Sequence, residues 1–105
     1  MNVQVNTDAN IDFDNGLAAT VENLVRHTLE RFGHRVTRLD VHLSDENSAS
    51  KSGPHDKKCL VEARLASHQP VAVSHHAATI VQAVNGAAHK MKHSLESTFG
   101  RLNGR

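Results

Sequence analysis

Apolar and polar residues alternate in four short segments of the chain, a period of two that is typical of β-strands with one buried face. The apolar positions of these segments are Val3 and Val5; Leu39, Val41 and Leu43; Cys59, Val61, Ala63 and Leu65; and Val71 and Val73. The third strand is expected to begin near Lys57, and Pro70 stands at the start of the fourth, where a proline is tolerated. The pattern therefore predicts four strands.

Two longer segments repeat their apolar residues at steps of three and four, which predicts two amphipathic helices. The first apolar stripe is made of Leu17, Val21, Leu24, Val25, Thr28, Leu29 and Phe32, and the second of Ile80, Val81, Val84, Ala88, Met91 and Leu95. Asp14 or Asn15 is placed to cap the first helix and Gly33 to end it. We expect the second helix to run from about His76 to Phe99 and to end at Gly100.

The resulting order of strand, helix, three strands and helix predicts an α+β domain of two layers, β-α-β-β-β-α. A right-handed crossover would make the first two strands parallel, and the others would continue as an antiparallel meander. Two helices are expected to pack on one face of this four-stranded mixed sheet, which leaves the other face polar. With 105 residues, the chain fits one domain over residues 1–100, followed by a short basic tail at 101–105.

Charge is nearly balanced over the whole chain but is uneven along it. Twelve Lys and Arg face eleven Asp and Glu, for a formal net charge of +1. Residues 47–105 hold eight of the cations and only three of the acids, so an anion-binding surface should draw mainly on the second half. The chain has no Trp or Tyr and three Phe, which leaves few aromatic platforms for stacking bases. A nucleic acid would therefore be bound through its backbone and shape.

The sequence gives little support for a membrane protein, a metal protein or an enzyme. It has neither a signal-peptide pattern nor a long apolar run, so we expect a soluble cytoplasmic protein, with Cys59 as a core residue and not a reactive thiol. His89 and His93 stand four apart and His75 and His76 are adjacent, but such pairs are too few ligands for zinc. Carboxylates at Ser44–Glu46 lack a glycine-rich phosphate loop or an activated nucleophile, so we expect no catalysis, no cofactor and no small-molecule substrate.

The chain resembles the ribosome hibernation promoting factors, also called ribosome-associated inhibitors or sigma-54 modulation proteins. The resemblance runs over almost the whole chain, and its strongest part is the last helix. Family members carry Ala-Ile-Asp and then Asp-Lys-Leu-Glu-Arg-Gln-Leu there, where this chain has Ala83-Val84-Asn85 and His89-Lys90-Met91-Lys92-His93-Ser94-Leu95. Lys90 and Leu95 match, and Val84 and Met91 are apolar replacements. His89, Lys92, His93 and Ser94 depart from the family pattern. The chain resembles the short members of the family.

The resemblance implies a non-enzymatic translation inhibitor that binds RNA of the small ribosomal subunit, in the channel of mRNA and tRNA, and keeps ribosomes idle under stress. It also implies that basic residues of the two helices face that RNA. The expected contacts are Lys90, Arg101, Arg26, Arg31, His89, Lys92 and His93. Lys90 ranks first because it is the cationic residue that matches the motif.

Two other functions stay open on the sequence. One is a protein-interaction module that uses the open sheet face, where His42, Leu60 and Arg64 are expected. The other is a histidine-based metal-binding protein, which the low ligand count disfavours. Acids in the first helix, Glu22 and Glu30, stand beside its arginines and are expected to weaken RNA binding.

Overall fold

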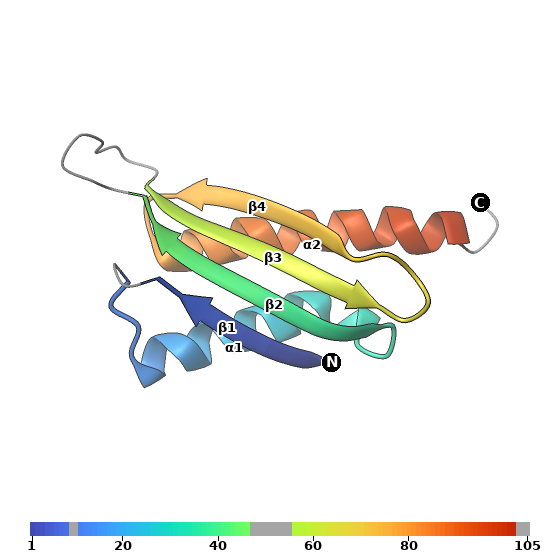
Figure 1. Cartoon of the computed structure of the whole chain (residues 1–105), viewed down its shortest axis with the longest axis horizontal. Coiled ribbons are helices and arrows are strands. Elements are labelled where there is room, and N and C mark those ends of the chain that lie inside the picture. The colour runs from blue at the N-terminus through green and yellow to red at the C-terminus, as the bar shows by residue number, and fades with distance from the viewer. Residues whose placement is uncertain (9–10, 47–55, 103–105) are drawn as a thin grey trace.

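The elements of the domain follow the predicted order (Figure 1). The computed structural model describes residues 1–8, 11–46 and 56–102, and for residues 101 and 102 it describes the backbone alone. The elements are β1 (Asn2–Thr7), α1 (Asn15–Leu29), the short 3₁₀ helix η1 (Glu30–Phe32), β2 (Val36–Asp45), β3 (Lys57–Leu65), β4 (Val71–Ala77) and α2 (Ile80–Leu102).

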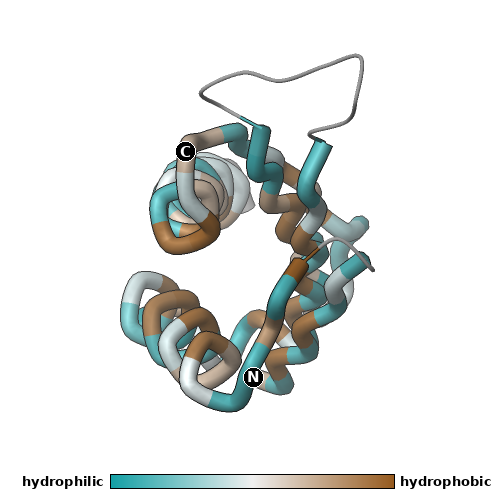
Figure 2. The backbone as a smooth tube through the Cα atoms, turned by 90° about the vertical axis from the view of Figure 1, so that its left-hand side faces the viewer, coloured by the Kyte–Doolittle hydropathy of each residue, from teal (hydrophilic) through white to brown (hydrophobic). Residues whose placement is uncertain are grey.

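The four strands form one mixed sheet in the order β1-β2-β3-β4. β1 pairs with β2 in parallel, so that Val3 lies opposite Leu39, and the β2–β3 and β3–β4 pairs are antiparallel. Both helices lie on the same side of this sheet, as the end-on view in Figure 2 shows. The predicted α+β sandwich of two layers is therefore confirmed.

The core lies between the sheet and the helices and is built from the alternating apolar positions. Leu39, Val41 and Val61 of the central strands are fully buried, as are Val25 of α1 and Met91 of α2. Burying one such side chain stabilises the fold by roughly 1.5–3 kcal/mol. The apolar faces of the strands and of the helices therefore pack against each other and form the two layers.

The single cysteine belongs to this core, as the sequence predicts. Cys59 is fully buried on β3, and burial raises the pKa of its thiol to about 12. A thiol with so high a pKa holds almost no nucleophilic thiolate at neutral pH. The residue therefore serves packing and not chemistry.

The first helix begins and ends close to the predicted residues. The Asp14 carboxylate accepts a hydrogen bond from the backbone N–H of Leu17 at 2.8 Å, which caps α1. After Leu29 the chain tightens into η1, and the N–H of Gly33 donates to the carbonyl of Glu30 at 3.1 Å. Gly33 thus closes the helical segment, with Phe32 buried just before it.

The start of the second helix was predicted about four residues too early. His76 does not begin the helix but lies in β4, where it pairs with Lys58 of β3. The strand continues to Ala77 because β3 offers pairing partners over that length. Thr79 then caps α2, since its hydroxyl accepts from the N–H of Gln82 at 3.1 Å.

The end of the second helix was also misplaced, because α2 continues through Gly100 to Leu102. A glycine inside a helix costs only about 1 kcal/mol relative to alanine. It ends a helix when the backbone turns left-handed, and Gly100 is followed instead by another helical residue. Of the predicted basic tail, residues 103–105 lie outside the described part of the chain.

Close packing fixes α2 over the edge strand β4. A Cβ atom built on Gly86 would lie 2.1 Å from Cδ2 of His75, so the absence of a side chain at residue 86 lets the helix approach the strand. The imidazole of His75 occupies that space and points to the helix side of the sheet, half-buried.

The opposite face of the sheet is polar, as predicted. His42 and Arg64 are exposed there, and Leu60 is half-buried. Asp40 is 6% exposed, and Nε of Arg38 donates to its carboxylate at 2.9 Å. Over the part of the chain that the structure describes, neither helix is long and apolar enough to cross a membrane.

Candidate nucleic-acid interface

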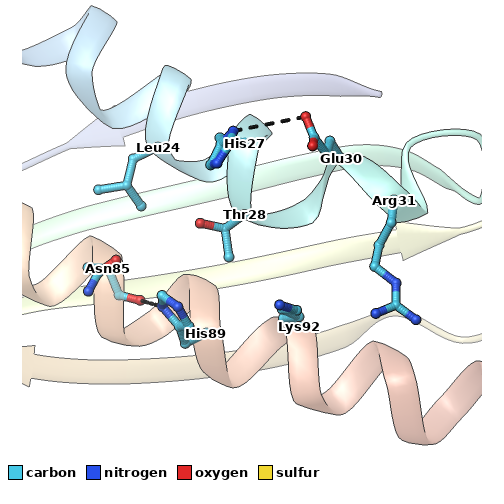
Figure 3. Close-up of a pocket in the computed structure, with 8 residues that line it drawn as sticks. All are labelled: Leu24, His27, Thr28, Glu30, Arg31, Asn85, His89 and Lys92. Atoms are coloured by element: carbon cyan, nitrogen blue, oxygen red, sulfur yellow. Dashed lines mark hydrogen bonds and ion pairs between the residues drawn. The ribbon is translucent and has the colours of Figure 1, made fainter.

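A groove of about 500 Å³ runs between α1 and α2 on the side of the domain away from the sheet (Figure 3). The residues that line it are Leu24, His27, Thr28, Glu30, Arg31, Asn85, His89 and Lys92. We call it the helix groove. The first five residues come from α1 and η1, and the last three come from α2. Two segments far apart in the sequence thus form one surface.

Cationic side chains lie on both sides of the helix groove. Arg31 and Lys92 are charged at neutral pH, whereas Glu30 is the anion among the lining residues. His27 lies 4.0 Å from the Glu30 carboxylate, measured from Nδ1 to Oε2. Nδ1 of His89 lies 2.9 Å from the carbonyl of Asn85. Because a carbonyl only accepts, this contact is a hydrogen bond in the tautomer that carries its proton on Nδ1.

Arg31 connects the end of the first helical segment to α2. Its Nη1 donates to Oε2 of Glu96 at 3.0 Å, and its guanidinium carbon lies 5.0 Å from the centroid of the Phe32 ring. The side chain is still 62% exposed, so the guanidinium keeps donors for another acceptor. Lys92, on the facing side of the groove, forms no hydrogen bond or ion pair with any residue that the structure describes. These two cations are the strongest candidates for binding phosphate.

Two of the other expected contacts lie outside the helix groove and are engaged with the protein. Arg26 donates to Glu22 and to the carbonyl of Met1, both at 3.0 Å, so it holds α1 against the start of the chain. Nζ of Lys90 donates to the carbonyl of Ser74 at 2.9 Å, on β4. The residue that sequence reasoning ranked first thus lies on the sheet side of α2.

The remaining expected contacts divide between the helix groove and its surroundings. His89 lines the groove together with Arg31 and Lys92, whereas His93 is largely exposed, with Nδ1 3.5 Å from Oε1 of Glu96. The backbone of Arg101 belongs to the last turn of α2, and its side chain lies outside the described residues.

A second hollow, of about 360 Å³, lies next to the first at the C-terminal part of α2. Its lining is Arg31, Phe32, His34, Arg35, Glu96, Phe99 and Gly100, and we call it the arginine pocket. Arg31 lines both hollows, so they share a border. Sequence reasoning missed His34 and Arg35, although three basic residues fall within Arg31–Arg35, between the helix and the next strand.

Metal binding finds no support in the geometry of the described residues, where three or more His, Cys, Asp or Glu side chains do not converge on one point. The adjacent histidines of β4 illustrate why. His75 packs against Gly86 of α2, whereas His76 lies 2.6 Å from the Glu46 carboxylate. Neighbouring residues of a strand point to opposite faces, so this pair cannot share a metal ion.

Comparisons with known proteins agree with this architecture. The model of the family described as Sigma 54 modulation protein / S30EA ribosomal protein matches residues 3–103. The Protein Y N-terminal domain of Thermus thermophilus is similar in structure, with a TM-score of 0.71, 17% sequence identity, and 93% of this chain and 99% of that chain covered. A ribosomal subunit interface protein from Coxiella burnetii has a TM-score of 0.76 and 12% identity, with 95% of this chain and 99% of that chain covered. No match was found among the curated proteins.

Proposed function

Since this chain belongs to the Sigma 54 modulation protein / S30EA ribosomal protein family, we propose that it is a non-enzymatic ribosome-associated factor. It binds RNA of the small subunit, in the channel that mRNA and tRNA use, and keeps ribosomes idle under stress. Its place of action is the cytoplasm. A structural relative carries the description of a ribosomal subunit interface protein, which supports the same assignment.

The observation that carries the proposal is the position of Arg31 and Lys92 on facing sides of one groove in a domain of this family. Phosphate groups of folded RNA present closely spaced negative charges, and proteins read them through Arg, Lys and exposed backbone. The 3₁₀ helix η1 and the helix α2 place these cations on the two sides of the groove. Such a surface recognises shape and backbone charge in preference to base sequence.

The proposal predicts binding to ribosomal subunits that depends strongly on salt. Purified protein is incubated with small subunits, large subunits and whole ribosomes, and the bound fraction is measured by co-sedimentation at about 50 and about 200 mM salt. Each neutralised phosphate releases counterions, so the affinity for small subunits should fall by roughly tenfold or more between these concentrations. Equal binding at both salt concentrations, or binding to large subunits alone, would contradict the proposal.

Paired variants identify the surface that binds. Arg31→Glu reverses a charge in the helix groove, whereas Arg64→Glu reverses an exposed charge on the open sheet face. Arg31→Glu should weaken binding to small subunits and relieve the inhibition of translation in a purified system, and Arg64→Glu should leave both unchanged. The reverse result would make the sheet face the interaction surface, as a protein-binding module requires.

A further inference from the structure

The arginine pocket holds a guanidinium for which the described residues offer no polar partner. Arg35 is half-buried, yet no residue whose side chain the structure describes forms a hydrogen bond or ion pair with its guanidinium. Its backbone is fixed, because its N–H donates to Phe32 and its carbonyl accepts from Ala66. A positioned guanidinium whose five N–H donors have no acceptor among the described residues is a group suited to a ligand.

The same guanidinium rests on an aromatic ring. Its central carbon lies 4.1 Å from the centroid of the Phe99 ring, and Phe99 lies 5.6 Å from the ring of Phe32. A planar cation that is covered on one side by an aromatic ring offers its other side for stacking, and nucleobases stack on arginine planes in this way. The pocket therefore supplies a flat platform in a chain that has few exposed aromatic residues.

A carboxylate stands in the wall of the pocket beside this platform. Glu96 lines the pocket, and its two oxygens already meet Nη1 of Arg31 at 3.0 Å and Nδ1 of His93 at 3.5 Å. Each carboxylate oxygen can accept a second hydrogen bond, so Glu96 retains acceptor capacity. Two neighbouring acceptors that are held in place by Arg31 suit a ligand edge with two neighbouring N–H donors.

We infer that the arginine pocket binds a guanine base, stacked on Arg35 with its edge turned to the Glu96 carboxylate. The inference deepens the proposed function, on which it rests, because an unpaired guanosine of RNA would enter the pocket next to the helix groove. A volume of about 360 Å³ accommodates a purine. Arg31, at the border of the two hollows, is placed to meet the attached phosphate.

Guanine is favoured over the other bases by the positions of its donors. Its N1–H and N2 amino group lie side by side and match the two oxygens of a carboxylate. Adenine and cytosine each place a ring-nitrogen acceptor beside their single amino group, and uracil flanks its one N–H with two carbonyls. These acceptors would face the Glu96 carboxylate and repel it, so the pocket selects through repulsion as well as attraction.

Nucleotide titrations of the isolated full-length protein test the pocket. GMP, AMP, CMP and UMP are titrated while NMR follows the Arg35 Nε–H and Gly100 amide signals. GMP should bind about tenfold more tightly than AMP, the discrimination expected of one bidentate contact. Equal affinities for the four nucleotides, or shifts confined to residues outside the pocket, would overturn the inference.

Two conservative variants separate the roles of the platform and the carboxylate. Glu96→Gln should reduce the preference for GMP over AMP to about twofold, because the amide replaces one acceptor by a donor. Arg35→Lys keeps the charge but loses the plane, and it should weaken all four nucleotides by roughly fivefold. Arg64→Lys, the matched change on the open sheet face, should alter neither value. Thermal unfolding of each variant verifies that the fold is kept, and an unaltered preference in Glu96→Gln would overturn the assigned role.

RNA hairpins distinguish an RNA base from a free nucleotide as the source of the guanine. Two hairpins that differ only in one unpaired residue, G or A, are compared with GMP. Tighter binding of the G hairpin supports the RNA source, whereas discrimination among free nucleotides alone assigns the pocket to them and overturns the RNA source. Ribosome co-sedimentation is run in parallel. If the protein binds ribosomes but shows no preference for guanine, the inference about the arginine pocket is wrong and the proposed function stands. If it prefers guanine but does not bind ribosomes, the proposed function is wrong and the pocket still binds guanine.

Discussion

Lys90 and Lys92 lie on opposite sides of α2 and make different contacts, and we call the side of Lys90 the sheet flank. Lys90 reaches back to the sheet, where its Nζ donates to the carbonyl of Ser74 on the edge strand β4. Lys92 lines the helix groove and has no polar partner among the described residues. One flank therefore holds the helix to the sheet, and the other places a charge in the helix groove.

The difference shows that neighbouring charges in a sequence do not make one surface. Residues in a helix are about 100° apart around the axis, so Lys90 and Lys92 differ by about 200°. Basic residues that are close together in the sequence therefore face different elements, β4 on one side of the helix and α1 on the other. Which half faces the helix groove depends on where the sheet and α1 pack, and that is a property of the fold.

The largest expected effect is on the sheet flank, where Gly86 lets α2 approach His75. Gly86→Val should lower the free energy of unfolding by about 3 kcal/mol, because a side chain at this position meets the imidazole ring and must force the layers apart. Chemical denaturation measures this loss. Gly100→Ala is the matched control, since a Cβ atom there meets nothing within 4 Å. It should stabilise the helix by up to about 1 kcal/mol. Equal effects of the two substitutions would show that the flank is not closely packed.

The next largest effect is on ribosome binding, and it compares the two lysines directly. Lys92→Glu should weaken binding to small subunits by roughly tenfold, because it replaces a cation of the helix groove by an anion near phosphate. Lys90→Glu makes the same change in charge two residues away and should cost less than half as much free energy. Co-sedimentation over a series of salt concentrations measures both. If Lys90→Glu were the more damaging variant, the sheet flank would be the RNA-binding one.

Most of the fold could be predicted from the sequence because burial imposes a period. The alternation around Val41 and Val61 identified the central strands, because a period of two places these residues on one face of a strand. The apolar stripe from Leu17 to Phe32 identified the first helix, because a period of 3.6 places it on one face of a helix. The start of the second helix was missed because it depends on pairing between two strands. A sequence does not show that β4 finds partners on β3 as far as Ala77.

The candidate site was predicted only in part. The sequence identified Arg31, His89 and Lys92, which the groove brings together, because they stand on the polar faces of predicted helices. The Glu22–Arg26 pair is an i,i+4 contact that helical spacing can predict, but the sequence could not show that Arg26 also donates to the carbonyl of Met1. A contact of the second kind depends on how elements distant in sequence pack, and periodicity within one helix contains no information about it.

The smallest expected effect concerns the stability that Lys90 contributes on the sheet flank. Lys90→Ala removes one exposed hydrogen bond to the Ser74 carbonyl, and water can take its place, so unfolding should become easier by about 0.5 kcal/mol or less. Lys92→Ala should change stability even less, because its ammonium has no partner among the described residues to lose. Chemical denaturation of the two alanine variants under identical conditions measures the difference. The sign matters more than the size: if Lys92→Ala were the more destabilising, the ammonium of Lys92 would be serving the fold, and the assignment of the two flanks would have to be exchanged.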